Sequence, residues 1–328
     1  MTTSRACSAG PWSSGDGAQV TADLVAELRR RGVTDVDDSV LTRALYSSDA
    51  SLYRVVPQVV ARPRHPDEIV AALDAARALG VPLTMRGAGT SIAGNAVGPG
   101  IVVDTARHLD RVLSLDPESR TAVVQPGVIH ASLTSKALAH GLRFGPDPST
   151  HTRCTIGGMI GNNACGSRAL GYGRTADNVA GMKVAFGTGE VAEVGGSSRT
   201  RSSTTGETGA SAPSSTAGGA LASLVDDHLA HVRTSFGRFS RQVSGYSFEH
   251  LLPENGPRVD RFLVGSEGTL GLVLEATVEL VVDDRDRRLL VLGYPSMAEA
   301  ADAVHRCTGV GAGGGRRRAA LGRPGPRG

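Results

Sequence analysis

A dense run of glycines between residues 81 and 100 is the part of the sequence best suited to chemistry. The segment reads VPLTMRGAGTSIAGNAVGPG, a short apolar strand signal followed by a loop. Glycine reaches positive φ and has no Cβ, so successive backbone N–H groups in such a loop can turn inward and bind an anion. Arg86 adds a fixed positive charge, and Thr90 and Ser91 add hydroxyl donors. The segment is predicted to bind a pyrophosphate, with a glycine-rich surface turn as the alternative.

Two common phosphate-binding patterns can be tested against this segment, and both fail. A Rossmann loop has a third glycine at the position that Ile92 occupies, and a GxxxxGK[ST] loop has lysine where Asn95 follows Gly94. A Rossmann loop also opens a helix, which the glycines and proline of residues 98–100 would interrupt. A phosphate site here must therefore belong to another class.

Two further stretches share the glycine-rich character. Residues 155–173 read TIGGMIGNNACGSRALGYG, and residues 262–280 read FLVGSEGTLGLVLEATVEL, with a Gly-Ser-Glu-Gly turn directly before a strand. The first is predicted to contain a short helix over 155–164, whose N-terminus points at the bound group and offers it positive partial charge. Close packing of a glycine-rich helix on a sheet is the competing explanation.

Four sequence blocks resemble a known family. They are PLTMRGAGTSIAG, GPDPST, TIGGMIGNNACGSRALGYGRTADNV and FLVGSEGTLG, and they occur in the family's order and at its approximate spacing within residues 46–295. The family is the vanillyl-alcohol-oxidase-type (PCMH-type) flavoproteins, and within it the branch of D-lactate dehydrogenases, glycolate oxidase flavin subunits and D-2-hydroxyglutarate dehydrogenases. The resemblance implies an α+β FAD-binding fold of two subdomains, with FAD along the seam between them.

The resemblance also implies a reaction, a cofactor and a set of residues. Members of this branch pass a hydride from a small 2-hydroxy acid to FAD, and electrons then reach an external acceptor such as a cytochrome, a quinone or an electron-transfer flavoprotein. The expected activity is that of a D-lactate dehydrogenase of the cytochrome type. FAD is expected to bind non-covalently, because Thr90 stands where members with histidyl-linked flavin carry histidine. The expected cofactor-binding residues are Arg86, Gly87, Ala88, Gly89, Thr90, Ser91, Pro146, Asp147, Gly157, Gly158, Gly161, Asn162, Asn163, Gly173, Glu267 and Gly268.

The composition is typical of a soluble globular protein without a nucleic-acid partner. Hydrophobic residues make up 40% and charged residues 20% of the 328 positions. Five arginines and no acid lie in the last twenty residues, and removing those five charges from the net +3 leaves −2, so the body has no basic surface for duplex binding. The four cysteines form no CxxC pair, which indicates free thiols in a reducing cytoplasm. Without a long apolar run, the chain is expected to be cytoplasmic, or peripheral at a membrane through its electron acceptor.

Hydrophobic spacing and turn residues predict the elements that position these stretches. Asp49 is interpreted as a turn residue, and His130 and His140 as ordinary polar groups. Helices are predicted over residues 21–31, 66–79, 130–139, 155–164, 220–236 and 296–307, and strands over 58–61, 101–104, 112–115, 121–125, 179–186, 190–194, 272–282 and 287–294.

The predicted organisation has six parts. These are a disordered leader (1–20), a helical segment (21–45), a first FAD-binding subdomain (46–126), a second one (127–285) with a flexible insertion at 195–219, the start of an α+β cap domain (286–308) and a disordered basic tail (309–328). The family's cap carries the metal or base histidines, and no HxxxxxxH cluster occurs here, so the sequence assigns no catalytic residue and no metal ligand. The cations nearest the predicted site are Arg168, Arg174 and Lys183, each interpreted as a surface charge.

Three functions stay open at this level. The first is an FAD-dependent D-2-hydroxy-acid dehydrogenase. The second is a non-catalytic, truncated FAD-binding fragment, or another enzyme of the same fold such as an alkylglycerone-phosphate synthase or an aldonolactone oxidase. The third is a nucleotide-binding module without flavin, which the failed phosphate-loop patterns disfavour. Because little of a cap is present, FAD binding is expected with weak or absent hydroxy-acid oxidation.

Overall fold

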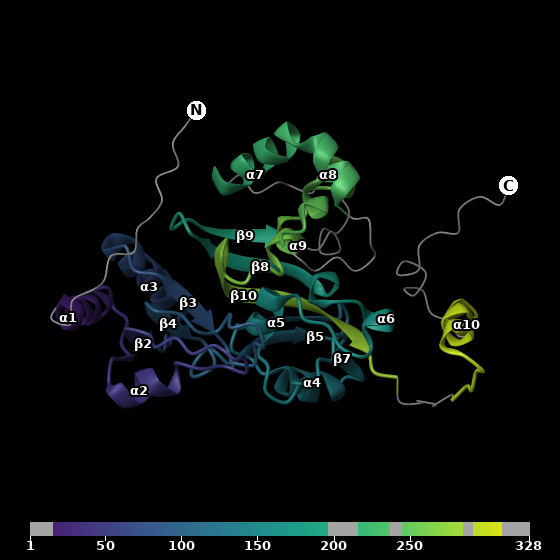
Figure 1. The fold of residues 1–328 in the computed structure, drawn as a ribbon, viewed down its shortest axis with the longest axis horizontal. Helices are drawn as coiled ribbons and strands as arrows, with labels where there is room; N and C mark the ends of the chain where they lie inside the picture. Colours follow the sequence, from purple (N-terminus) through teal and green to yellow (C-terminus); the bar gives the residue numbers. More distant parts are fainter. Residues whose placement is uncertain (1–15, 196–215, 237–244, 285–290, 310–328) are drawn as a thin grey trace.

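The computed structural model describes residues 16–195, 216–236, 245–284 and 291–309, and two β-sheets organise them (Figure 1). The first sheet has the strand order β1-β2-β4-β3, in which β2 and β3 both run parallel to β4 and β1 is antiparallel to β2. Its strands are β1 Val36–Asp37, β2 Val59–Ala61, β3 Leu83–Arg86 and β4 Ile101–Asp104. The predicted strands over 58–61 and 101–104 are present. Strand β1 was not predicted, because two residues are too few to show an alternating hydrophobic pattern.

Helix α3 (Pro66–Leu79) carries the chain from β2 to β3, as the sequence predicts. Proline occupies the first helical position, His65 Nδ1 accepts the N–H of Asp67 at 3.3 Å, and Gly80 ends the helix in the left-handed region at φ 63°. The buried face is apolar and consists of Pro66, Ile69, Ala72, Leu73, Ala75 and Ala76. This strand–helix–strand unit places the glycine-rich segment directly after β3.

Two more helices flank the first sheet. Helix α1 (Asp16–Arg30) begins five residues before the predicted start, so the end of the expected leader is helical and not disordered; residues 1–15 lie outside the described residues. Helix α2 (Val40–Leu45) lies within the segment 21–45 that was expected to be helical, although no separate helix was predicted there, and it is capped by Ser39, whose side chain accepts the N–H of Thr42. Short helices of mixed polarity give no clear periodic signal, which is why the pattern misses α2.

The second sheet is antiparallel throughout and has the order β5-β6-β10-β8-β9, with β7 also paired to β10. Its strands are β5 Val112–Asp116, β6 Thr121–Val124, β7 Leu142–Phe144, β8 Val179–Phe186, β9 Val191–Gly195 and β10 Gly271–Val282. The predicted hairpin of β8 and β9 is present. The two-sheet α+β class is therefore confirmed.

The β5–β6 hairpin lies in a different sheet from the one expected. Residues 112–125 belong to the predicted first subdomain (46–126), but β6 pairs with β10, with Ala276 opposite Val124. Local pattern identifies a hairpin and not its distant partner. Strand β7, three residues long, is also absent from the predicted elements and pairs with the end of β10.

Strand β10 joins the two halves of the molecule. Its residues alternate between buried and half-buried from Gly271 onward, as the sequence pattern predicts. Leu272 and Leu274 pack in the same core as α3 and the first sheet, while Ala276, Val278 and Leu280 pack in the core of the second sheet. One strand thus contributes to both hydrophobic cores, and the seam between the sheets lies along it.

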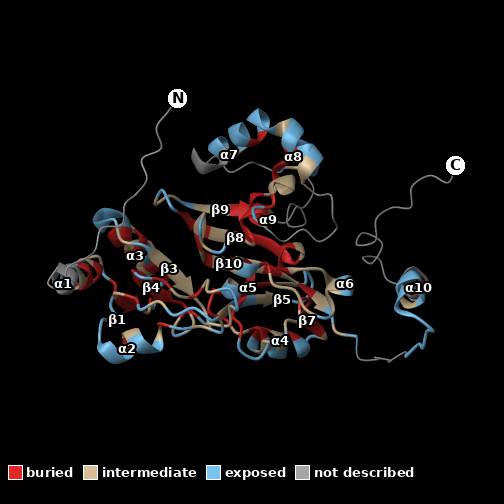
Figure 2. Cartoon of the chain, in the orientation of Figure 1, coloured by how far each residue is buried: buried red, intermediate tan, exposed pale blue. Residues whose placement is uncertain are grey.

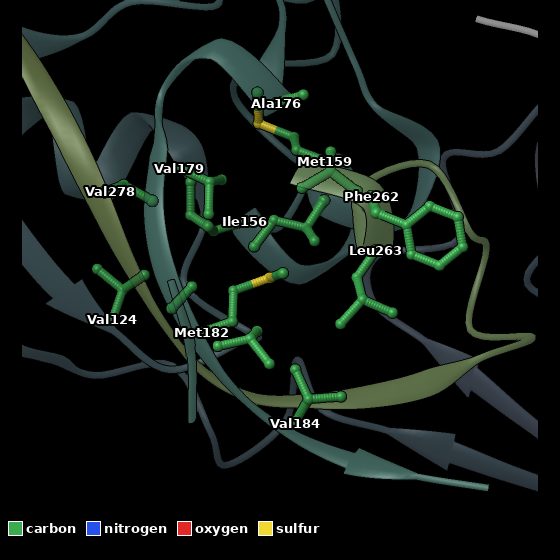
Figure 3. Packing of buried hydrophobic residues seen from close by; sticks show 14 of the residues in the cluster. Val124, Ile156, Met159, Ala176, Val179, Met182, Val184, Phe262, Leu263 and Val278 are labelled. Carbon is green, nitrogen blue, oxygen red and sulfur yellow. The ribbon is translucent and has the colours of Figure 1, made fainter. Parts of the chain in front are cut away.

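Short helices cover the second sheet. They are α4 His130–Leu138, α5 Ile156–Asn162, α6 Ala169–Tyr172, α9 Val259–Leu263 and the 3-10 turns Thr175–Asp177, Phe248–Leu251 and Pro253–Asn255. Figure 3 shows Ile156 and Met159 of α5 pointing into the core beside Phe262 and Leu263 of α9 and toward Met182 of β8. Helix α5 is therefore held by apolar packing on its inner face.

The remaining helices are mostly exposed (Figure 2). The single helix predicted over 220–236 is two helices, α7 (Thr216–Asp227) and α8 (Leu229–Ser235), which meet at His228. Helix α10 (Met297–Gly309) agrees with the prediction, but residues 291–294 form no strand, and Leu292 and Val304 are about half exposed. The expected insertion, apart from its ends, and the basic tail beyond Gly309 lie outside the described residues, as do Leu289 and Leu290.

Candidate functional site

A groove of about 610 Å³ opens at the junction of the two sheets, beside the end of β3. Four segments line it: residues 85–92 after β3, residues 148–150, helix α5 with its flanking residues, and the turn at 266–268. The structure thus brings together three stretches that are far apart in the sequence. The predicted cofactor-binding residues in its lining are Arg86, Gly87, Ala88, Gly89, Thr90, Ser91, Gly157, Gly158, Gly161, Asn162, Asn163, Glu267 and Gly268.

Arg86 is folded beneath the loop that follows it. One guanidinium nitrogen donates to the carbonyl oxygens of Ser48 and Ala96, each at 3.0 Å, and the guanidinium carbon lies 5.1 Å from the centre of the Tyr46 ring. Within the described residues, no carboxylate lies within ion-pair distance of this guanidinium. Arg86 therefore braces the loop and places a half-buried positive charge beneath it, a charge that also acts on the Asp49 carboxylate.

The glycine loop, defined here as residues 87–91, offers backbone donors to the groove. Gly89 has φ +65°, a conformation that side chains with a Cβ rarely adopt, and a Cβ there would lie 2.6 Å from an Arg86 nitrogen. In the part of the chain that the structure describes, no protein oxygen accepts a hydrogen bond from the amide N–H groups of residues 87–91. Five consecutive amides and the charge of Arg86 together form an anion-binding surface.

The segment before β2 holds the glycine loop in place. The N–H of Ala50 donates to the carbonyl of Gly89 at 3.1 Å, and the Asp49 carboxylate accepts the N–H groups of Ser51 and Ala96 at 2.8 and 3.3 Å. Asp49 is thus a turn residue, as the sequence indicates, and it also ties the entry segment to the far end of the glycine-rich segment.

The first turn of α5 does not present free donors to the groove. Thr155 caps the helix, with its hydroxyl accepting the N–H of Gly158 at 3.1 Å, and the N–H groups of Ile156 and Gly157 donate to Val128 and Pro126 at 2.8 Å each. All three amides of the turn are therefore already bonded to protein. The expected helix is present, and its N-terminal amides are used in packing, in agreement with the competing explanation; whether its N-terminus faces a cofactor stays a prediction.

The opposite wall is a junction between α5 and the turn before β10. Gly265 and Glu267 donate their N–H groups to the carbonyls of Ile160 and Gly161, and Asn162 Nδ2 donates to Glu267 Oε1 at 3.2 Å. Glu267 has φ +55°, which is costly for a residue with a Cβ. Desolvation in the groove raises the pKa of its carboxyl, against hydrogen bonds from Asn95 and Asn162 that lower it.

Three predicted residues lie outside the groove. Asp147 forms an ion pair with Arg168 at 3.1 Å, and the carbonyl of Pro146 lies 2.7 Å from His130 Nε2. Gly173, with φ +77°, lies against the Asp177 side chain. The structure therefore gives these three positions contacts with protein, and whether they reach a cofactor stays a prediction.

The three cations proposed near the site have carboxylate neighbours. Arg168 is paired with Asp147, as above, and Arg174 Nε lies 3.4 Å from Asp177. Lys183 on β8 is paired in register with Glu193 of β9 and Glu275 of β10. Each fits a structural charge, in agreement with its interpretation from the sequence.

Several residues that line the groove are not identified from the sequence. Asn95 and Ser149 carry no signal apart from their neighbours, Cys154 precedes the predicted helix over 155–164, and Thr155 is the first residue of that helix. Contact across the seam is a tertiary property, so spacing along the chain does not identify them. The missed lining residues include Ile92, Asn95, Ala96, Thr105, Pro126, Pro148, Ser149, Thr150, Cys154, Thr155, Cys165 and Ser266.

The described residues contain neither a cluster of metal ligands nor a membrane-spanning helix. No group of three or more His, Cys, Asp or Glu side chains in them could hold a metal ion. No helix in the same residues has the length and apolar character needed to cross a membrane.

Comparisons with known proteins agree with this geometry. Residues 57–195 match the family model described as an FAD binding domain. The chain is 31% identical over 292 residues to D-2-hydroxyglutarate dehydrogenase of Escherichia coli and 31% identical over 288 residues to glycolate oxidase subunit GlcD of Bacillus subtilis. It covers 28% and 50% of those relatives, which in turn match 86% and 87% of this chain.

Solved structures show the same fold. An alkyldihydroxyacetonephosphate synthase superposes with a TM-score of 0.56 at 18% identity, covering 92% of this chain and 47% of the synthase. At this identity the likeness concerns the fold alone.

Residues 57–195 thus form an FAD-binding domain of the PCMH type, carried on a two-sheet fold. Within that class the chain is a homologue of the D-2-hydroxyglutarate dehydrogenases, glycolate oxidase GlcD subunits and D-lactate dehydrogenases, and it spans at most half the length of the relatives compared here.

Proposed function

We propose that the chain binds FAD non-covalently in the groove at the seam of the two sheets. The observation that carries this proposal is the glycine loop: in the described residues, five amide N–H groups without a protein acceptor lie above the positive charge of Arg86, which makes no ion pair there. Donors and charge of this kind suit a pyrophosphate, which is doubly negative and rich in acceptor oxygens.

The groove fits the rest of the cofactor in size and in chemistry. Its volume of about 610 Å³ lies within the range of small-molecule and cofactor sites. Residues 87–91 would hold the pyrophosphate, while Asn162 and Glu267 on the opposite wall supply polar groups for the hydroxyls or ring edge of the ligand. The apolar lining near the seam, including Val184 and Val273, suits a flat ring system.

The proposed reaction class is oxidation of a small D-2-hydroxy acid, with electrons passed to an external acceptor. The support is homology to proteins named D-2-hydroxyglutarate dehydrogenase, GlcD and D-lactate dehydrogenase at about 30% identity. Bound FAD would supply the hydride-accepting chemistry that no side chain of the groove provides. The chain's own residues would bind and orient the cofactor and exclude water from one of its faces.

A titration with two flavins tests the binding proposal. FAD and FMN share the ring and ribityl chain, but FMN lacks the pyrophosphate, so the glycine loop should favour FAD by about 100-fold or more, a difference of about 2.7 kcal/mol. Flavin fluorescence quenching on addition of the flavin-free chain measures both constants. Equal affinity for the two flavins would show that the loop is not the pyrophosphate site.

Acid precipitation tests the mode of attachment. Thr90 cannot form the histidyl linkage, so trichloroacetic acid should leave the yellow colour in the supernatant. Colour retained in the pellet would contradict non-covalent binding.

A second candidate function is FAD binding without turnover. The observation that favours it is that Arg168, Arg174 and Lys183, the cations nearest the predicted site, all have carboxylate neighbours. Dye reduction with D-lactate or D-2-hydroxyglutarate separates the two candidates. Turnover of about 1 s⁻¹ or more, the low end for ordinary enzymes, would exclude a purely binding role for this chain.

A further inference from the structure

One wall of the groove is a loop that can make few hydrogen bonds of its own. Residues 145–150 read GPDPST, and the two prolines have no N–H to donate. Pro148, Ser149 and Thr150 line the groove directly, and Cys154 follows them in the lining. The position of this wall must therefore be fixed by groups outside the loop.

The first turn of α4 supplies those groups. His130 Nε2 lies 2.7 Å from the carbonyl oxygen of Pro146, and the backbone N–H groups of His130 and Ala131 donate to Cys154 and His151 at 3.0 Å each. The two ends of the loop are thus attached to adjacent residues of one helix. Of these three bonds, only the side-chain bond reaches the proline-containing half, which Arg168 also holds through its N–H and Nε contacts to the Asp147 carboxylate at 3.1 Å each.

The hydrogen-bond partners assign the protonation of the His130 ring. A carbonyl oxygen can only accept, so Nε2 carries the proton and donates. Nδ1 is buried and has no partner in the described residues, and the same holds for the hydroxyl of Thr134 one turn further along α4. The residue is 2% exposed. Burial lowers the pKa of the ring, and the neighbouring charges of His151 and Arg143 act in the same direction, against the Pro146 carbonyl and Asp147.

We infer that His130 is a positioning residue for the flavin groove: its Nε2–H bond to Pro146, together with the contacts of Arg168 to Asp147, fixes the wall formed by residues 146–150. The inference rests on the proposed function, because the wall matters for the cofactor that the groove holds. It assigns a role to a histidine that the sequence pattern indicates to be an ordinary polar residue. His130 acts through the loop and does not itself line the groove.

Three substitutions of His130 distinguish the need for a hydrogen-bond donor at the place of Nε2 from the need for a donor anywhere on this side chain. In His130→Gln the terminal amide reaches about the place of Nε2, whereas in His130→Asn the same amide ends about the place of Nδ1 and cannot reach Pro146. His130→Ala removes the donor altogether. His140→Ala, an exposed histidine just beyond the end of the same helix, is the matched control.

The thiol of Cys154 reports the state of the wall without any flavin. Cys154 is 5% exposed and lies at the end of the loop, while Cys165 lines the same groove from beyond α5 and serves as internal reference. The full chain without added FAD is treated with iodoacetamide, and peptide mass spectrometry gives each rate. Alkylation of a buried thiol depends on local opening, so His130→Asn and His130→Ala should raise the Cys154 rate about 10-fold relative to Cys165.

Rescue by glutamine distinguishes positioning from bulk stability. His130→Gln should keep the Cys154 rate and the FAD dissociation constant within about 3-fold of wild type, and His130→Asn should weaken FAD binding about 10-fold. If Asn and Gln variants behave alike, or if both cysteines accelerate together, His130 does not position the wall. If wild type binds no FAD while the Cys154 pattern holds, the proposed function fails and the positioning role stands.

Discussion

The glycine loop (residues 87–91) and the first turn of α5 (residues 156–158) are the two glycine-rich segments that line the groove, and they use their backbone in opposite ways. The amides of the loop have no protein acceptor in the described residues, whereas all three amides of the helical turn are bonded to Thr155, Pro126 and Val128. One segment offers donors to a ligand, and the other consumes them in packing. Glycine density alone therefore does not identify an anion site. What identifies it is whether the backbone N–H groups already donate to protein acceptors.

The difference extends to the space around each segment. A Cβ at Gly89 would meet the end of the Arg86 side chain, and φ there is positive, while a Cβ at Gly157 would lie 2.7 Å from Cβ and 2.8 Å from the carbonyl of Pro126. Gly89 is required by the conformation of the loop, and Gly157 by a close approach of two backbones. The comparison predicts that substitutions in the two segments affect different measurable quantities.

The largest effect on FAD affinity is expected for Gly89→Val. A β-branched side chain opposes φ +65° and displaces the Arg86 guanidinium, so the loop cannot keep the backbone conformation in which it lines the groove. The dissociation constant for FAD should rise about 100-fold or more, as measured by fluorescence titration. Gly171→Val, at a position with open space around it, is the control. FAD binding by the Gly89 variant at wild-type strength would remove the glycine loop from the site.

A smaller effect is expected for Arg86→Lys. Lysine keeps the charge but cannot donate to the carbonyls of Ser48 and Ala96 together while stacking on Tyr46. The loss of the brace should weaken FAD binding about 10-fold, and Arg86→Gln, which loses the charge as well, should weaken it further. Isothermal titration of both variants with FAD distinguishes the loss of the hydrogen bonds to Ser48 and Ala96 from the loss of the positive charge. Identical affinities for Lys and Gln would mean that charge makes no contribution.

A few-fold effect of pH is expected from Glu267. Its raised pKa keeps the carboxyl protonated to a higher pH than an ordinary glutamate, and ionisation above that pKa adds a negative charge to a groove that holds an anion. FAD affinity should therefore fall about 2- to 4-fold as pH rises from 4.5 to 8, a Coulomb term of under about 1 kcal/mol across a solvated groove. Glu267→Gln should flatten this profile. An FAD affinity of the wild-type chain that increases with pH would contradict this explanation.

The smallest effect on affinity is expected for Gly157→Ala. The added methyl group overlaps Pro126, so the free energy of unfolding should fall by about 1 to 2 kcal/mol, while the folded fraction binds FAD within about 3-fold of wild type. Urea denaturation and flavin titration of the same sample measure both quantities. A large loss of FAD affinity with unchanged stability would show that the amides of α5 also donate to FAD. The contrast drawn here between the glycine loop and the first turn of α5 would then be wrong.

The sequence predicts the local elements of this molecule better than their partners. Helix α3 is marked at both ends by His65-Pro66 and Gly80, and β10 by clean alternation, so both are readable from neighbours alone. The pairing of β6 with β10, the break at His228 and the short strand β7 depend on contacts with distant residues. Propensity and spacing carry no information about these contacts.

The candidate site shows the same division. The motifs identify the segments that meet in the groove, because those segments need glycine at particular positions. They do not reveal that Arg86 is held under the loop by Ser48 and Ala96, nor that the α5 amides are occupied. Both facts require the entry segment and residues 126–128 to be in place, which only the folded chain shows.

The central position of β10 has a consequence for how this domain is made. β10 lies between β6 and β8 in the second sheet, yet it is the last strand of that sheet to leave the ribosome. Until residue 282 has been synthesised, β6 and β8 each expose an unpaired edge, and pairing such as that of Ala276 with Val124 closes a long loop, which makes it slow. Exposed strand edges recruit other chains, so the nascent protein passes through an interval in which aggregation competes with folding. Slower translation before β10 should lengthen that interval. Because β10 is synthesised after its neighbours in the sheet, we expect folding during synthesis to depend on chaperones.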